Sequence, residues 1–178
     1  MSRPLLISDC DEVLLHMIVP FRDWLDEAHH IHFDLVHGDW GEALRHKHDG
    51  TQVERGLVWE LLNGFFVTEM HRQQAIDGAV EAINRIMDIA DVVILTNLTD
   101  QHQLTRAAQL RALGIDAPVY TNQGGKGEAL ARILAEPGRM PILLSPSADA
   151  RDILRDPPPG PVTLVVVDGT WSQARSVV

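Results

Sequence analysis

The sequence predicts an α/β fold in which a parallel, doubly wound sheet carries a small helical segment inserted after its first strand. Short apolar runs alternate with amphipathic segments along most of the chain, and the runs are continuous enough for strands buried on both faces. Between residues 17 and 75 this alternation stops, and apolar residues instead follow a helical spacing. We therefore expect a sheet-based core and a helical insertion.

The elements on either side of the insertion define the expected core. Residues 4–8 form an apolar run that stops at Asp9, which is typical of a buried strand. Residues 76–90 are amphipathic at helical spacing, which predicts a helix. A strand is expected over 91–95, ending at Thr96-Asn97, and then a helix over 100–113 that Gly114 ends. The last expected elements of this part are a strand over 118–120 and a helix over 127–134 that Lys126 opens.

The last part of the chain differs from the rest in its sequence pattern. Residues 141–145 and 162–167 are apolar runs, and the second ends at Asp168. A helix is expected over 148–154, and a proline-rich loop follows it. We expect the two apolar runs to be strands that complete the parallel sheet.

Composition limits the classes of protein to consider. The 178 residues suit one α/β domain, or one domain plus a fragment of another. The formal net charge of −10 argues against nucleic acid as a partner. The single cysteine, Cys10, excludes an intrachain disulfide and fits a reducing compartment. We expect no signal peptide and no membrane helix, because no apolar run approaches the ~20 residues that a span needs. A soluble cytoplasmic protein is the expectation.

Four polar side chains are expected at the carboxyl ends of the strands, where open α/β sheets bind ligands. They are Asp9, Asp11, Thr96 and Lys126. One carboxylate can attack phosphorus, and a second one two residues later can exchange a proton with the leaving group and with water. A hydroxyl can hold a phosphoryl oxygen, a lysine can offset negative charge, and Mg²⁺ prefers oxygen ligands. This pattern predicts a phosphoryl-transfer site.

The motifs around these residues resemble those of the haloacid dehalogenase superfamily of hydrolases over residues 1–140. LLISDCDEVL is similar to the first motif, VVILTNL to the second and GGKGEAL to the third. The resemblance implies a Rossmann-like core (1–16 and 76–140), a helical cap (17–75), and Mg²⁺-dependent cleavage of a small phosphorylated substrate. It implies Asp9 as nucleophile, Asp11 as acid and base, both as metal ligands, and Thr96, Asn97 and Lys126 at the phosphate.

The fourth motif of that superfamily places one or two acids after the next strand, and this chain departs from it. The strand expected over 141–145 is followed by Pro146-Ser147-Ala148 instead. Three later acids are candidates to complete the metal site: Asp149, Asp152 and Asp168. An alternative is an inactive domain of the same fold with an incomplete metal site.

Residues 141–178 resemble a fragment of a second family, the DTW-domain tRNA-uridine aminocarboxypropyltransferases. The segment VTLVVVDGTWSQAR carries the resemblance. It implies S-adenosylmethionine as cofactor and an alternative site at Asp168, Thr170 and Trp171, followed by Gln173, Ala174 and Arg175. The change of signature near residue 140 indicates a fusion, a frameshift or a constructed hybrid.

The insertion is rich in aromatic side chains and histidines. We expect Trp24, Trp40 and Trp59 to pack in its core. The spacing of its histidines matches no standard zinc pattern, so we expect them at the surface or lining the cap. These histidines include His29, His30, His32, His37, His46 and His48.

Overall fold

The computed structural model describes residues 3–35, 39–134, 140–144, 155 and 160–166. The chain divides into two compact units. One unit is formed by the residues up to Leu14 together with those from Ile76 onward, and the other is Leu15–Ala75. The second unit corresponds to the insertion expected over 17–75.

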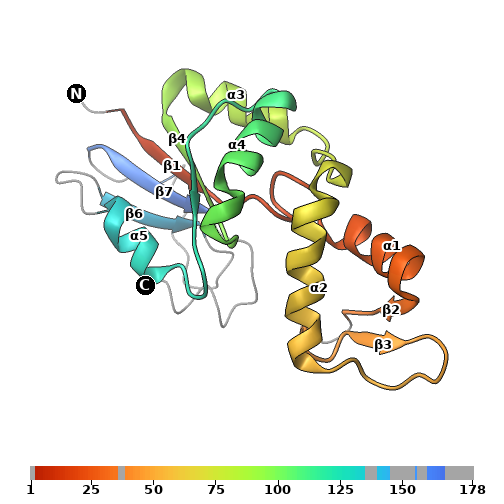
Figure 1. The fold of residues 1–178 in the computed structure, drawn as a ribbon. Coiled ribbons are helices and arrows are strands. Elements are labelled where there is room, and N and C mark those ends of the chain that lie inside the picture. Colours follow the sequence, from red (N-terminus) through yellow and green to blue (C-terminus); the bar gives the residue numbers. More distant parts are fainter. Residues whose placement is uncertain (1–2, 36–38, 135–139, 145–154, 156–159, 167–178) are drawn as a thin grey trace. The chain divides into compact units, whose positions relative to one another are not determined.

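The first unit is built on a parallel sheet. Among the described residues the sheet has five strands in the order β5-β4-β1-β7-β6 (Figure 1), and each neighbouring pair is parallel. The strands are β1 (Leu5–Ser8), β4 (Asp91–Thr96), β5 (Val119–Thr121), β6 (Met140–Leu144) and β7 (Val162–Val166). The predicted α/β class with a parallel sheet is therefore confirmed, and this sheet is compatible with a Rossmann-like fold.

Helices lie on both sides of this sheet. Helices α3 (Ala79–Ile89) and α4 (Gln103–Ala112) lie on one side, and α5 (Gly127–Leu134) lies on the other (Figure 1). On the α5 side, Ala129 and Leu130 pack against Ile7 and Leu95, which alternate along their strands with residues of the opposite face. Burial on both sides explains why β1 is buried at all of its positions and reads as a continuous apolar run.

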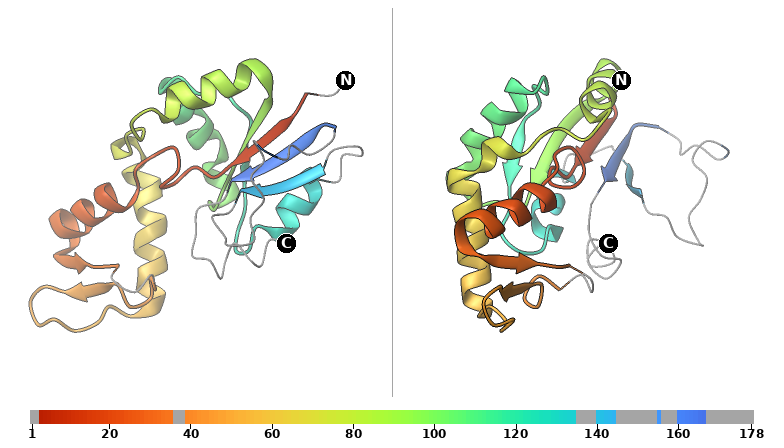
Figure 2. Two further views of the ribbon diagram at one scale, coloured as in Figure 1. Left: turned by 180° about the vertical axis from the view of Figure 1, so that it is seen from behind. Right: turned by 90° about the vertical axis from the view of Figure 1, so that its right-hand side faces the viewer.

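The two strands from the last part of the chain belong to the same sheet. β7 pairs with β1 on the side opposite β4, and β6 pairs with the outer side of β7 (Figure 2). The register brings Ser8 opposite both Ile94 of β4 and Val166 of β7. Because the strands are parallel, their carboxyl ends meet at one edge of the sheet. The helix expected over 148–154 lies outside the described residues.

The helix expected over 100–113 consists of a short 3-10 turn, η2 (Asp100–His102), followed by α4. The helix ends just before Gly114, as predicted. Gly114 has a φ of 98°, a left-handed conformation that glycine adopts without the steric strain of a side chain. The N–H of Ile115 then donates to the carbonyl of Leu110 at 2.8 Å, which closes the last turn.

The insertion is not purely helical, so that expectation is wrong. It contains helices α1 (Ile18–His29) and α2 (Arg55–Thr68), the 3-10 turn η1 (Met70–Arg72), and the strands β2 (Ile31–Phe33) and β3 (Leu44–His46). β2 and β3 form an antiparallel pair. At three residues each, these strands are too short to produce a readable alternation in the sequence.

Phe21 is the centre of the insertion core. Its side chain is completely buried, and its ring centroid lies 5.4 Å from that of Phe65 and 5.6 Å from that of Phe33, both edge-to-face. Trp24 and Trp40 join the cluster, with centroids 6.1 and 5.8 Å from Phe21. Trp59, by contrast, is 52% exposed on α2, so the expectation that it packs in the core is wrong.

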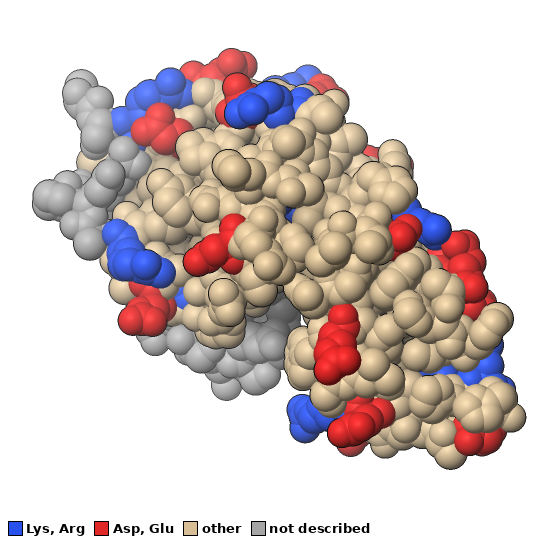
Figure 3. All heavy atoms as spheres, in the orientation of Figure 1, with Lys and Arg blue, Asp and Glu red and all other residues tan. Residues whose placement is uncertain are grey.

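Charged side chains of both signs are interspersed over the face of the molecule that Figure 3 shows. Several form exposed ion pairs, such as Arg85 with Glu81 and Arg111 with Asp116. Such pairs contribute little to stability. In the described part of the chain, no helix has the length and apolar character needed to cross a membrane.

Candidate active site at the carboxyl edge of the sheet

The predicted site residues come from the ends of three neighbouring structural elements. Asp9 directly follows β1, and Asp11 lies two residues further on. Thr96 is the last residue of β4, the parallel neighbour of β1. Lys126 directly precedes α5, which packs on the same sheet. Four side chains that lie as far as 117 residues apart in sequence thus reach one edge of the sheet.

Asp9 and Lys126 form a buried ion pair. The Nζ of Lys126 contacts Oδ2 of Asp9, and the two side chains are only 8% and 11% exposed. The N–H of Cys10 donates to Oδ1 of Asp9 at 2.8 Å. Burial raises the pKa of the Asp9 carboxyl above its usual range, and the positive charge of Lys126 opposes that effect. The ammonium group therefore stabilises the ionised, nucleophilic form of Asp9.

Asp11 and Thr96 are joined by a hydrogen bond. The hydroxyl of Thr96 donates to Oδ2 of Asp11 at 3.2 Å. Thr96 is completely buried, whereas the side chain of Asp11 keeps 21% of its surface exposed. Asp11 is thus more open to solvent than Asp9, Thr96 or Lys126. This greater exposure suits a group that exchanges protons with water.

Arg106 belongs to the same cluster, although the sequence analysis did not select it. It lies on α4 with its side chain completely buried, and Nη2 is 2.9 Å from Oδ1 of Asp11. Nη1 donates to Oε1 of Gln109, one turn later, at 3.0 Å. The pattern did contain a signal, because Arg106 lies four residues before the buried Leu110 and so shares the inward face of the helix. An arginine on a buried helix face requires a partner for its charge.

Asn97, expected near the phosphate, is exposed directly after β4. Its Oδ1 accepts a hydrogen bond from Nδ2 of Asn122 at 3.1 Å, and the N–H of Asn122 donates to the carbonyl of Thr96 at 3.0 Å. Asn97 is therefore held by the segment that follows β5.

The segment after β1 turns sharply at the two acids. The N–H of Leu14 donates to the carbonyl of Cys10 at 2.8 Å, and Glu12 has a φ of 56°, which is unusual for a residue with a side chain. Such conformations are often found at functional sites. Cys10 is completely buried, and this burial raises the pKa of its thiol. It therefore remains a protonated thiol and acts as packing within the turn.

The fit of this site to a magnesium ion can be judged from its donor atoms. Asp9 and Asp11 offer carboxylate oxygens, and Mg²⁺ is commonly held by one or two carboxylates together with waters and substrate phosphates. These two side chains therefore fit the ion. Among the described residues, no group of three or more His, Cys, Asp or Glu side chains is arranged to hold a metal. The candidates for a third acid, Asp149, Asp152 and Asp168, lie outside the described residues.

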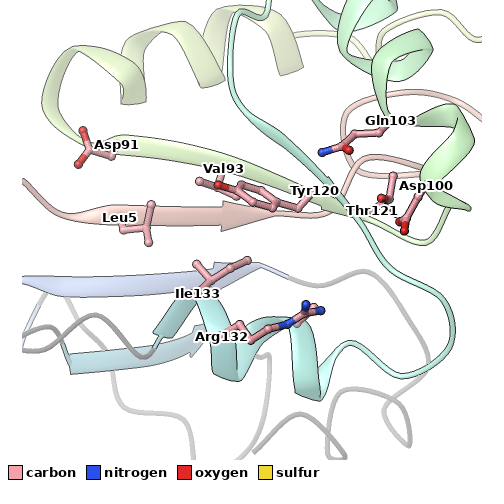
Figure 4. Close-up of a pocket in the computed structure, with 10 residues that line it drawn as sticks. Leu5, Asp91, Val93, Asp100, Gln103, Tyr120, Thr121, Arg132 and Ile133 are labelled. Carbon is pink, nitrogen blue, oxygen red and sulfur yellow. Dashed lines mark hydrogen bonds between the residues drawn. The ribbon is translucent and has the colours of Figure 1, made fainter.

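One cavity of the first unit is separate from these residues. It has a volume of about 610 Å³ and opens beside α5, over the α5 side of β1, β4 and β5 (Figure 4). Leu5, Val93 and Tyr120 line it from the strands, and Arg132 and Ile133 line it from the helix. None of the described residues that line it belongs to the predicted site.

Comparison of the chain with models of known protein families and with curated proteins gave no match. The candidate site therefore depends on its own geometry. The predicted residues of the alternative transferase site lie outside the described residues: Asp168, Thr170, Trp171, Gln173, Ala174 and Arg175.

Proposed function

We propose that this protein is a phosphate-ester hydrolase of the haloacid dehalogenase type, acting on a small phosphorylated substrate through an aspartyl-phosphate intermediate. One observation carries the proposal: Asp9, buried at the end of β1, pairs with Lys126, and Asp11 and Thr96 lie hydrogen-bonded at the same edge of the sheet. A nucleophile, a charge-neutralising cation, a proton-transfer group and a phosphate-binding hydroxyl are the parts that this reaction requires.

The first step is the transfer of the phosphoryl group to Asp9. An oxygen of Asp9 forms a bond to phosphorus while the bond from phosphorus to the ester oxygen breaks. Asp11, in its protonated form, gives its proton to that leaving oxygen. Lys126 offsets the negative charge of the phosphoryl group, and the hydroxyl of Thr96 holds one of its oxygens. The products are an alcohol and phosphorylated Asp9.

The second step regenerates the enzyme. Asp11, now ionised, removes a proton from a water molecule as the water oxygen attacks phosphorus. The bond between phosphorus and the Asp9 oxygen breaks, so inorganic phosphate leaves and Asp9 returns as a carboxylate. A magnesium ion held by Asp9 and Asp11 would supply further neutralisation of charge on the phosphoryl group.

Replacement of the nucleophile tests the proposal. Asp9→Asn removes the attacking oxygen, so hydrolysis of 4-nitrophenyl phosphate in the presence of Mg²⁺ should fall to the rate of the blank. Asp91→Asn is the matched control, because Asp91 begins β4 at the opposite edge of the sheet. Its activity should equal that of the native protein. Unchanged hydrolysis by Asp9→Asn would refute the assignment.

A non-catalytic domain of the same fold is the second candidate, and the observation that favours it is the missing third acid among the described residues. The two candidates differ in their affinity for the metal. Calorimetric titration with MgCl₂ should show binding by a hydrolase, and binding should weaken in Asp9→Asn. No heat of binding at millimolar Mg²⁺, together with no hydrolysis, would support the second candidate.

A further inference from the structure

Arg106 is the most deeply buried charged side chain of the first unit's described part, and its charge is directed at the predicted acid and base. The side chain has no exposed surface, and its Nη2 lies 2.9 Å from Oδ1 of Asp11. Because a buried guanidinium is costly without a partner, this pairing is a specific feature of the fold. It joins α4 to the turn after β1.

The two oxygens of Asp11 are held differently. Oδ1 accepts from the charged guanidinium of Arg106, whereas Oδ2 accepts from the neutral hydroxyl of Thr96 at the longer distance of 3.2 Å. A hydrogen bond to a charged donor is about twice as strong as one between neutral groups. Of these two bonds the one with Arg106 is therefore the stronger, and Oδ2 is the oxygen on the weaker side.

We propose that Arg106 is a positioning residue for proton transfer: it anchors Oδ1 of Asp11 so that Oδ2 exchanges the proton with the leaving group and with water. This inference rests on the proposed function. The planar fork of arginine suits the role, because Nη1 is bonded to Gln109 while Nη2 is bonded to Asp11, so that rotation of the group would break these bonds.

The arrangement also balances the charge of the site. Asp9 and Asp11 lie two residues apart, and each has its own cation: Lys126 for Asp9 and Arg106 for Asp11. The two ion pairs sum to no net charge, so an anionic phosphate does not meet two uncompensated carboxylates. Loss of Arg106 removes the charged anchor of Oδ1 and leaves the negative charge of Asp11 without that compensating cation.

The dependence of the rate on the leaving group separates positioning of the acid from a general structural role. An alkyl phosphate such as glycerol 2-phosphate needs a proton on its leaving oxygen, whereas the nitrophenolate of 4-nitrophenyl phosphate leaves without one. Arg106→Met should lower kcat/KM for glycerol 2-phosphate by about 100-fold and for 4-nitrophenyl phosphate by less than about 10-fold. Arg106→Lys keeps the charge but not the planar fork, so its kcat/KM for glycerol 2-phosphate should lie between the values of Arg106→Met and the native protein.

Two further variants complete the experiment. Arg111→Met replaces an exposed arginine on the same helix and should leave both rates unchanged. In an Asp11→Asn background, Arg106→Met should cause no further change in the ratio of the two rates, because Arg106 acts through Asp11. If Arg106→Met does not fold, as judged by circular dichroism, the comparison is made with Arg106→Lys.

The outcomes distinguish this inference from the proposed function. Arg106→Met could cause an equal loss for both substrates, or an additive loss in the Asp11→Asn background. If Asp9→Asn still abolishes hydrolysis, either result would show that Arg106 is only structural and would leave the proposed function intact. Normal hydrolysis by Asp9→Asn, or no hydrolysis by the native protein, would overturn the proposed function and this inference with it.

Discussion

Replacement of Lys126 by methionine tests the electrostatics of the site through stability rather than activity. Lys126 and Asp9 are 8% and 11% exposed, so both charges have lost most of their contact with water. Removal of one partner from a buried ion pair leaves the other charge uncompensated, which typically costs about 3–5 kcal/mol. We therefore expect Lys126→Met to lower the free energy of unfolding by about that amount above neutral pH.

The pH dependence of this loss follows from the pKa of Asp9. Burial raises that pKa in the folded state, and Lys126 is the group that opposes the rise, so the variant should have a still higher pKa. A folded state that binds its proton more tightly than the unfolded state loses stability as pH increases. The loss in Lys126→Met should therefore be small at acidic pH, where folded Asp9 is protonated in both proteins, and should grow by at most about 1.4 kcal/mol per pH unit above the raised pKa that Asp9 has in the native fold.

Urea denaturation followed by circular dichroism, at about pH 5 and about pH 8, measures both effects. Lys47→Met is the matched control, because Lys47 is the chain's other lysine and pairs with Asp26 at the surface. Its effect should be small at both pH values. The double variant Asp9→Asn with Lys126→Met removes both charges and should recover most of the stability. An equal loss at both pH values, or a double variant as unstable as Lys126→Met, would refute the reasoning.

Two other predictions address the insertion and the metal site. Phe21→Ala should destabilise the insertion by about 3–5 kcal/mol, because it empties the centre of the aromatic cluster; tryptophan fluorescence during urea denaturation measures the change, and a loss below about 1 kcal/mol would contradict it. Asp168→Asn should weaken Mg²⁺ binding about tenfold or more in calorimetry, because Asp168 follows Val166 by two residues and Val166 pairs with Ser8, next to Asp9. Asp152→Asn should leave the affinity for Mg²⁺ unchanged. If Asp152→Asn weakens binding and Asp168→Asn does not, the third ligand is Asp152.

The proximity of Asp9, Asp11, Thr96 and Lys126 could be predicted because it depends on few assumptions. Parallel strands buried on both faces produce continuous apolar runs, and their carboxyl ends share one edge of the sheet. A polar residue at the end of such a run is therefore predicted to lie at the carboxyl edge of the sheet. The contacts between Lys126 and Asp9 and between Thr96 and Asp11 agree with that position.

The role of Arg106 could not be predicted in the same way. Its partner Asp11 lies 95 residues away in the sequence. The helix pattern shows only that Arg106 and Leu110 share a face, and not which strand end that face meets. The exposure of Trp59 was mispredicted for a related reason: an aromatic residue on a helix gives no information about which of its neighbours will cover it.

The sequence by itself determined the class of fold, the approximate bounds of the core elements and the edge at which polar groups gather, because these depend on local periodicity and on where each strand ends. Tertiary structure alone decided the order of the strands, with β7 between β1 and β6, and the pairing of Arg106 with Asp11. Both depend on contacts between distant segments, whose energies appear only when the chain is folded and water is excluded from between them.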